Sequence, residues 1–153
     1  MNNIKIVLYQ KRLDHLFGQI GLLSEQIELQ SHWARYLCVL VSGFLEIGIR
    51  EILIKHAHEQ SSPTVANFID GKLREFRNPK MGKILKLIGL FSREWEAAIE
   101  RQTEGELKDA VDSIVANRNR ISHGEDVSIT YARIYDYYQR AIKFIDICEG
   151  QCH

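Results

Sequence analysis

Apolar residues recur every three or four positions along almost the whole chain. The clearest stripe lies near the C-terminus and consists of Tyr131, Ile134, Tyr135, Tyr138, Ala141, Ile142, Ile145 and Cys148. This spacing places the side chains on one face of an α-helix. Residues 31–58 are instead apolar on nearly all sides, which is typical of a helix surrounded by others. The pattern therefore predicts an all-α bundle with residues 31–58 at its centre.

Cap and turn residues divide this pattern into about five or six helices, which form a single domain over residues 1–153. Ser62 is expected to cap one helix, and Thr103 with Glu106 three residues later predicts a capping box at the start of another. Gly124 is expected to end that helix, and Ser128 to cap the last one. The expected segments are 5–28, 31–58, 63–76, 80–102 (two helices or one kinked helix), 103–122 and 128 onward.

The composition narrows the class of protein. The chain has 153 residues, and 20 Lys and Arg balance 20 Asp and Glu, so any nucleic-acid binding has to come from a local basic cluster. Its longest apolar run, residues 36–41, is too short to cross a bilayer. Three cysteines, an odd number, favour a reducing cytoplasm over a secreted disulfide framework. No group of Cys and His completes a metal site, and we expect neither a metal nor a cofactor.

One charged residue interrupts the apolar stripe of segment 103–122. The stripe reads Leu107, Val111, Ile114 and Ile121, and the position that would complete it is Arg118. At about 100° per residue, Arg118 points within about 20° of the direction of Leu107. Because an unpaired guanidinium is costly to bury, Arg118 has to meet a carboxylate or open onto a cleft that receives an anion.

The neighbours of Arg118 favour the cleft. They are donors suited to phosphate, close to a helix end: Asn117, Asn119, Arg120, Ser122 and His123. Arginine offers a planar fork to phosphate oxygens, and histidine exchanges protons near neutral pH. On a straight helix, however, Arg118 and His123 point about 140° apart. Either the helix unwinds at 121–124, or two chains related by a two-fold axis build one cleft from two incomplete halves.

The string from Arg118 to Gly124, Arg-Asn-Arg-Ile-Ser-His-Gly, resembles the signature of the HEPN superfamily, the higher eukaryotes and prokaryotes nucleotide-binding domain. Nuclease members carry Arg, a polar residue that is often Asn, three to five further residues and His near the end of a penultimate helix. The resemblance covers nearly the whole chain. It is strongest to the small prokaryotic nucleases of toxin–antitoxin and defence loci.

The resemblance implies a homodimeric, metal-independent endoribonuclease that cleaves RNA through attack of the ribose 2′-hydroxyl. By position, Arg118 would bind the scissile phosphate, His123 would act as general acid or base, and Asn119 would orient the site. Arg120 and Ser122 would support it. A small antitoxin protein is a further partner that the family suggests. Because many HEPN proteins bind without catalysis, a helical module that binds RNA, nucleotides or a protein is the alternative.

Three other groups of residues carry candidate chemistry. Ser42, Glu46 and Arg50 recur every four residues and share one helix face, with Arg35 on the same side; this face is either a set of salt bridges or the place where Glu46 supports Arg118 or His123. A separate alternative for Arg118 is an ion pair with Glu46 inside an inert structural bundle, which predicts a monomer. A basic middle segment is either a solvated face or a groove for RNA; it comprises Lys72, Arg74, Arg77, Lys80, Lys83 and Lys86. The tyrosines of the last helix are expected to pack rather than to stack on bases.

Overall fold

The computed structural model describes residues 2–153 and contains seven helices and no strand within them. The expected all-α class is confirmed, but the expected number of five or six helices is too low. The helices are α1 (Ile4–Gly21), α2 (Ile27–Gln60), α3 (Pro63–Leu73), α4 (Met81–Phe91), α5 (Arg93–Thr103), α6 (Glu106–Ser122) and α7 (Tyr131–Gln151). Segment 80–102 is two helices because the backbone of Ser92 is extended and its hydroxyl accepts a hydrogen bond from the Trp95 amide, which caps α5.

Two expected helix starts differ in the structure. Thr103 forms no capping box; it ends α5, where its buried hydroxyl donates to the Ile99 carbonyl. Gly105, at φ 87°, precedes α6 instead, in a conformation that costs glycine little. The last helix is capped by the Thr130 hydroxyl, which accepts from the Arg133 amide, and not by Ser128.

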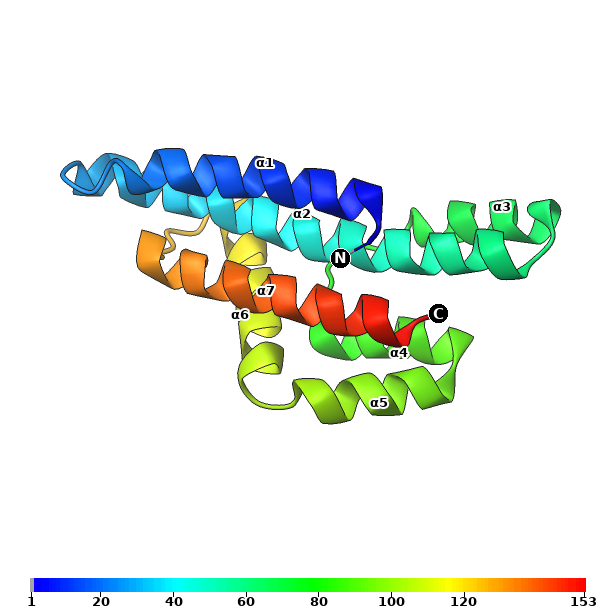
Figure 1. Ribbon diagram of the computed structural model, residues 1–153. Coiled ribbons are helices and arrows are strands. Elements are labelled where there is room, and N and C mark those ends of the chain that lie inside the picture. The colour runs from blue at the N-terminus through cyan, green and yellow to red at the C-terminus, as the bar shows by residue number, and fades with distance from the viewer. Residues whose placement is uncertain (1) are drawn as a thin grey trace.

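The long helix α2 is the centre of the bundle, as its apolar sequence predicts. It packs against α1, α3, α6 and α7, and Figure 1 shows it running between α1 and α7. Its start lies at Ile27 rather than at residue 31, after a turn that follows α1. At that turn, Tyr131 donates a hydrogen bond to the Phe17 carbonyl, and its hydroxyl lies 2.9 Å from where a Cβ on Gly21 would be. A side chain at position 21 would therefore require the Tyr131 hydroxyl to shift.

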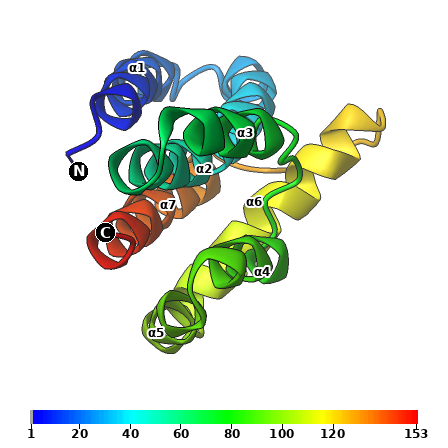
Figure 2. The ribbon, with the colours of Figure 1, turned by 90° about the vertical axis from the view of Figure 1, so that its right-hand side faces the viewer.

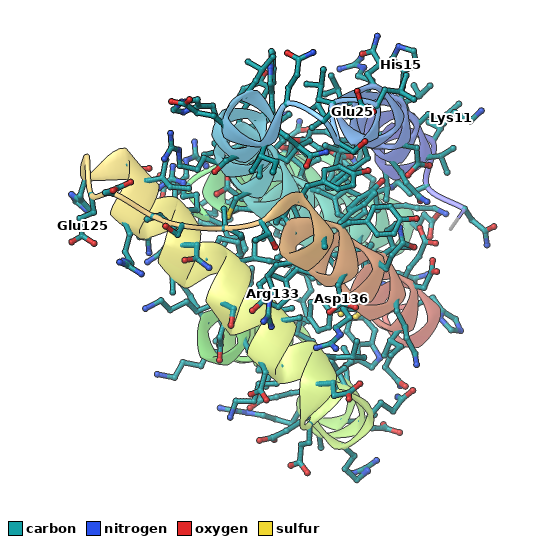
Figure 3. The ribbon with its side chains drawn as sticks, turned by 90° about the vertical axis from the view of Figure 1, so that its left-hand side faces the viewer. Lys11, His15, Glu25, Glu125, Arg133 and Asp136 are labelled. Carbon is teal, nitrogen blue, oxygen red and sulfur yellow. The ribbon has the colours of Figure 1, made fainter. Side chains whose placement is uncertain are left out.

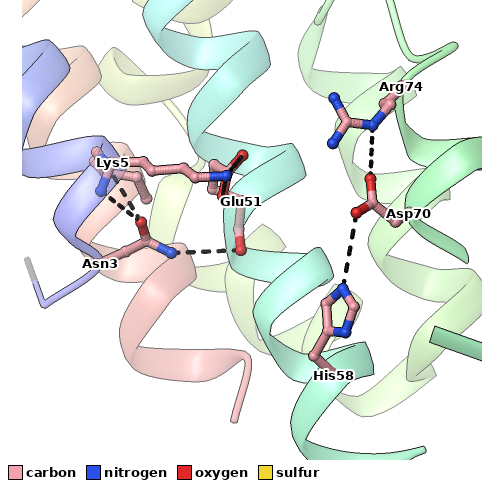
Figure 4. A network of polar contacts seen from close by, with 7 residues as sticks. Asn3, Lys5, Glu51, His58, Asp70 and Arg74 are labelled. Carbon is pink, nitrogen blue, oxygen red and sulfur yellow. Dashed lines mark hydrogen bonds and ion pairs between the residues drawn. The ribbon is translucent and has the colours of Figure 1, made fainter. Parts of the chain in front are cut away.

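Polar contacts connect α1 and α3 to the C-terminal half of α2 (Figure 4). The Asn3 side-chain oxygen caps α1 by accepting hydrogen bonds from the backbone amides of Lys5 and Ile6. Its side-chain nitrogen donates to the backbone carbonyl of Glu51 on α2. One to two turns further along α2, His58 lies 3.7 Å from Asp70 of α3, and Asp70 lies 2.8 Å from Arg74. These contacts hold α1 and α3 along the same central helix.

Helix α6 runs across the bundle rather than along it. In Figure 1 it lies nearly at right angles to α2 and α7, and in Figures 2 and 3 its C-terminal end projects beyond the other helices. Glu125 marks the tip of this projection in Figure 3. Its middle packs in the core through Val111, Ile114 and Val115, each fully buried. The bundle therefore buries the middle of α6 and presents its last turns.

The three cysteines are buried and unpaired. Burial raises the pKa of the Cys38 and Cys152 thiols to about 12, and it raises that of Cys148 as well, so all three stay protonated at neutral pH. No helix among residues 2–153 is long and apolar enough to span a membrane.

Tyr138 of α7 is fully buried and contacts α1. Its ring stacks on Phe17 with centroids 4.6 Å apart, and its hydroxyl lies 2.6 Å from the Asp14 carboxylate and 3.1 Å from the Gln10 carbonyl. Burial raises its pKa above the ordinary value of 10, and the hydrogen bond to Asp14 raises it further. An unfolded chain would release this proton near pH 10 while the folded chain keeps it.

We predict that Tyr138→Phe lowers the free energy of unfolding by about 1–2 kcal/mol at neutral pH, because the buried hydroxyl loses its hydrogen bonds. The pKa is higher in the folded state, so stability falls as pH rises above 10, and this fall should be shallower in the variant. Urea unfolding between pH 7 and 11 measures both effects. Tyr135→Phe, on the same helix but half exposed, is the control and should match the wild type; equal losses in the two variants would contradict the prediction.

Candidate functional site

Arg118 lies on the last turns of α6, half-buried and without an acidic partner among residues 2–153. Among residues 2–153 its guanidinium makes one hydrogen bond, donated from Nη1 to Oδ1 of the adjacent Asn119 at 3.4 Å. That contact is with a neutral group and does not neutralise the charge. The guanidinium therefore stays half-buried with capacity to bind an anion.

Glu46 does not supply the missing carboxylate. Its Oε1 atom lies 3.7 Å from Arg50 and 3.6 Å from Arg77, so its charge is shared between those two residues. The single-chain pairing of Arg118 with Glu46 is therefore wrong for this structure. Arg77 in turn donates to the carbonyls of Arg74 and Phe76, so Glu46 helps to hold the loop between α3 and α4.

That loop carries a residue that the sequence analysis did not select. Asn78 has φ 59°, in the left-handed region. Its side-chain oxygen accepts a hydrogen bond of 2.7 Å from Nδ2 of the Asn119 side chain. Asn119 thus connects Asn78 on one side with Arg118 on the other. Asn78 precedes Pro79, and asparagine is one of the few residues that adopts this conformation readily. The sequence therefore predicts a turn at Asn78, but it does not predict the hydrogen bond to Asn119, which is 41 residues away.

The end of α6 is a Schellman motif. The amides of Gly124 and Glu125 donate back to the carbonyls of Ile121 and Arg120, and Gly124 has φ 76°. The His123 amide still donates to the Asn119 carbonyl, so the helix stays regular until its last residue. Within 121–124, the helix continues through Ser122 and ends in a turn at His123 and Gly124, so it does not unwind before His123.

The other residues of the motif fasten this end. The Ser122 hydroxyl donates to the Arg118 carbonyl at 2.9 Å, and Arg120 Nε lies 2.9 Å from the Glu125 carboxylate. Both side chains thus have structural contacts in the single chain. The following loop is tied to α2 by Arg35, which lies 3.5 Å from Asp126 and also contacts His32.

His123 lies at the tip of this structure, with an exposed side chain. Its ring has no hydrogen-bond partner among residues 2–153. Because α6 is helical through Ser122, the C-cap residue His123 lies about 140° around the helix axis from Arg118. One chain therefore brings Arg118, Asn119 and Asn78 together but does not bring His123 to them.

The remaining candidates fall into two groups. Ser42 is buried, and the basic residues of the middle segment are all exposed. The tyrosines of α7 pack mainly inside the molecule: Tyr138 is fully buried, and Tyr131 and Tyr137 are partly so. Across residues 2–153, no group of three or more His, Cys, Asp or Glu side chains is arranged to hold a metal ion.

The comparison with known families agrees with the all-α fold. The family model described as RiboL-PSP-HEPN matches residues 7–152, which is nearly the whole chain. The chain therefore belongs to this HEPN family. It matches no curated protein and no solved structure.

We predict that Gly124→Ala destabilises the protein by about 1 kcal/mol or more, because a Cβ is disfavoured in the left-handed conformation of this turn. The surrounding space is open, so backbone strain is the only cost. The control is Gly18→Ala in the interior of α1, also in open space, which should stabilise by about 1 kcal/mol. Thermal unfolding compares them, and a Gly124→Ala protein as stable as the wild type would exclude a strict need for glycine at this turn.

Proposed function

We propose that this protein is a HEPN-type endoribonuclease that cleaves RNA without a metal, at a site shared by two copies of the chain. The observation that carries the proposal is the half-buried guanidinium of Arg118, which has no acidic partner and lies on the exposed end of α6. A phosphate group would supply the negative charge that the single chain lacks. Family membership supports an RNA-related role for the same region.

In this proposal Arg118 of one copy and His123 of the other act on one phosphate. A regular α6 keeps the two side chains apart within a chain, whereas a two-fold axis near its projecting end would bring opposite copies together. Asn119, held by Asn78, would keep the Arg118 side chain in place. Glu46 would contribute indirectly, because it holds the loop that carries Asn78.

The proposed chemistry is an internal transfer. A histidine removes the proton from the 2′-hydroxyl, the 2′-oxygen attacks phosphorus, and the bond from phosphorus to the 5′-oxygen breaks. The departing oxygen receives a proton, leaving a 2′,3′-cyclic phosphate and a 5′-hydroxyl. Arg118 stabilises the charge that develops on the non-bridging oxygens. Water protonates the departing oxygen, so each phosphate requires one histidine, which comes from the copy opposite to its Arg118.

We further propose that the enzyme acts as the toxin or effector of a toxin–antitoxin or defence system in the cytoplasm, with a small antitoxin protein as partner. A ribonuclease whose catalytic groups lie on an exposed helix end is accessible to a protein that covers it. This biological role rests on the resemblance of the motif to small prokaryotic HEPN nucleases.

A non-catalytic module that binds RNA is the second candidate. The observation that favours it is the free imidazole of His123, because no residue among 2–153 fixes its tautomer or orientation. A catalytic histidine is commonly oriented by a second group. In the dimer proposed above, that group would come from the other copy or from the RNA.

We predict that the purified protein cleaves single-stranded RNA in EDTA and leaves DNA of the same sequence intact. His123→Ala should reduce the rate by about 10²–10⁴-fold, the range for loss of a general acid or base. Arg118→Lys should also lose activity, because it keeps the charge but loses the planar fork. The matched control is His15→Ala, an exposed histidine on α1, labelled in Figure 3, which should cleave like the wild type.

The products distinguish the candidates. A cyclic phosphate terminus, detected by mass spectrometry, would support 2′-hydroxyl attack. Tight RNA binding with no cleavage by any of the proteins would favour the binding module. Cleavage that persists unchanged in Arg118→Ala would contradict the role given to that residue.

A further inference from the structure

An open hollow of about 550 Å³ lies between α4 and the second half of α6. Figure 2 shows these two helices next to each other. The lining consists of Lys80, Gly82, Lys83, Lys86, Asp112 and Ala116. Three of these six residues are lysines and one is an acid, so the hollow is a concentrated positive surface on a chain whose net charge is zero.

The charges of this hollow are largely unneutralised by the protein itself. Asp112 uses its carboxylate to accept a hydrogen bond of 2.9 Å from the Met81 amide at the start of α4. Lys80 and Lys86 have no ion pair among residues 2–153, and Lys83 donates to the Arg77 carbonyl rather than to an acid. Three ammonium groups that line one hollow repel one another, and an external polyanion relieves that repulsion.

The hollow is continuous with the motif at the end of α6. Ala116 lines it and lies three residues before Asn119, on the same face of the helix. Lys80 follows Asn78 by two residues, and Asn78 is hydrogen-bonded to Asn119. A chain lying in the hollow would therefore reach Asn119 and Arg118 at one end.

The lining also indicates which part of a nucleic acid would bind. Gly82 and Ala116 leave the floor open, and a Cβ on Gly82 would meet nothing within 4 Å. The lining holds no aromatic ring to stack on a base and no Arg, Asn or Gln to read a base edge. Lysines on an open floor suit a phosphodiester backbone of any sequence.

We propose that this lysine hollow binds the backbone of a single-stranded RNA substrate on its way to Arg118, without reading its sequence. The proposal rests on the proposed function. It adds to the cleavage site a neighbouring surface that binds the RNA backbone. Phosphates beside Lys80, Lys83 and Lys86 would anchor the strand, while selectivity for sequence would come from elsewhere.

The test is the salt dependence of RNA binding. Lys80, Lys83 and Lys86 are changed together to Ala in a His123→Ala protein, so that binding is measured without turnover. The slope of log affinity against log salt should decrease by about 2, since each phosphate contact to a single strand contributes about 0.7. Affinity at low salt should fall at least about tenfold. The control removes three exposed lysines from other helices, Lys11, Lys55 and Lys143, and should leave the slope close to that of the parent.

Cleavage then separates this proposal from the proposed function. In the otherwise wild-type protein, the triple lysine change should raise KM for a long RNA but leave the rate on a dinucleotide, which is too short to reach the hollow, unchanged. An unchanged salt slope, an equal loss in the control, or an absence of RNA binding would overturn the lysine hollow. If the triple change reduces the salt slope but the wild-type protein cuts no RNA, the lysine hollow is confirmed as an RNA-binding surface and the proposed ribonuclease activity is contradicted.

Discussion

The end of α6 is the constraint on which the site depends. The helix is regular through Ser122, and a Schellman motif with Gly124 at positive φ ends it there. The helical rotation up to the C-cap places His123 about 140° around the axis from Arg118. Arg118 and His123 are thereby kept apart in each chain, and this separation is the reason for the shared site that we propose.

The rest of the bundle serves to present this helix end. Its middle is buried against α2 and α7, so α6 cannot move freely, while its last turns extend beyond the core. Glu46 and Arg77 hold the loop that carries Asn78, and Asn78 holds Asn119. The polar face of α2 is thus connected to the motif through the loop before α4 rather than by direct contact with Arg118.

Periodicity alone predicts much of this fold. The stripe of α7 and the all-round apolar character of α2 both correspond to buried helices, because burial is what such patterns reflect. Local cap signals were less informative. Thr103 and Glu106 have the spacing of a capping box, but a glycine with positive φ between them takes the position of the cap. The sequence predicts that Arg118 interrupts the apolar stripe of its helix. It does not predict the connection of Arg118 to Asn78 through Asn119, because that connection depends on a contact between distant segments.

The proposed site makes one demand that a single chain cannot meet, namely that the guanidinium and the imidazole come from different copies. The most direct test mixes Arg118→Ala protein with His123→Ala protein, each inactive alone, after exchange of differently tagged subunits is verified by mass spectrometry. The account predicts that RNA cleavage returns, because about half of the exchanged dimers then join an intact Arg118 to an intact His123 from the other chain. A mixture that exchanges subunits and stays inactive would contradict it.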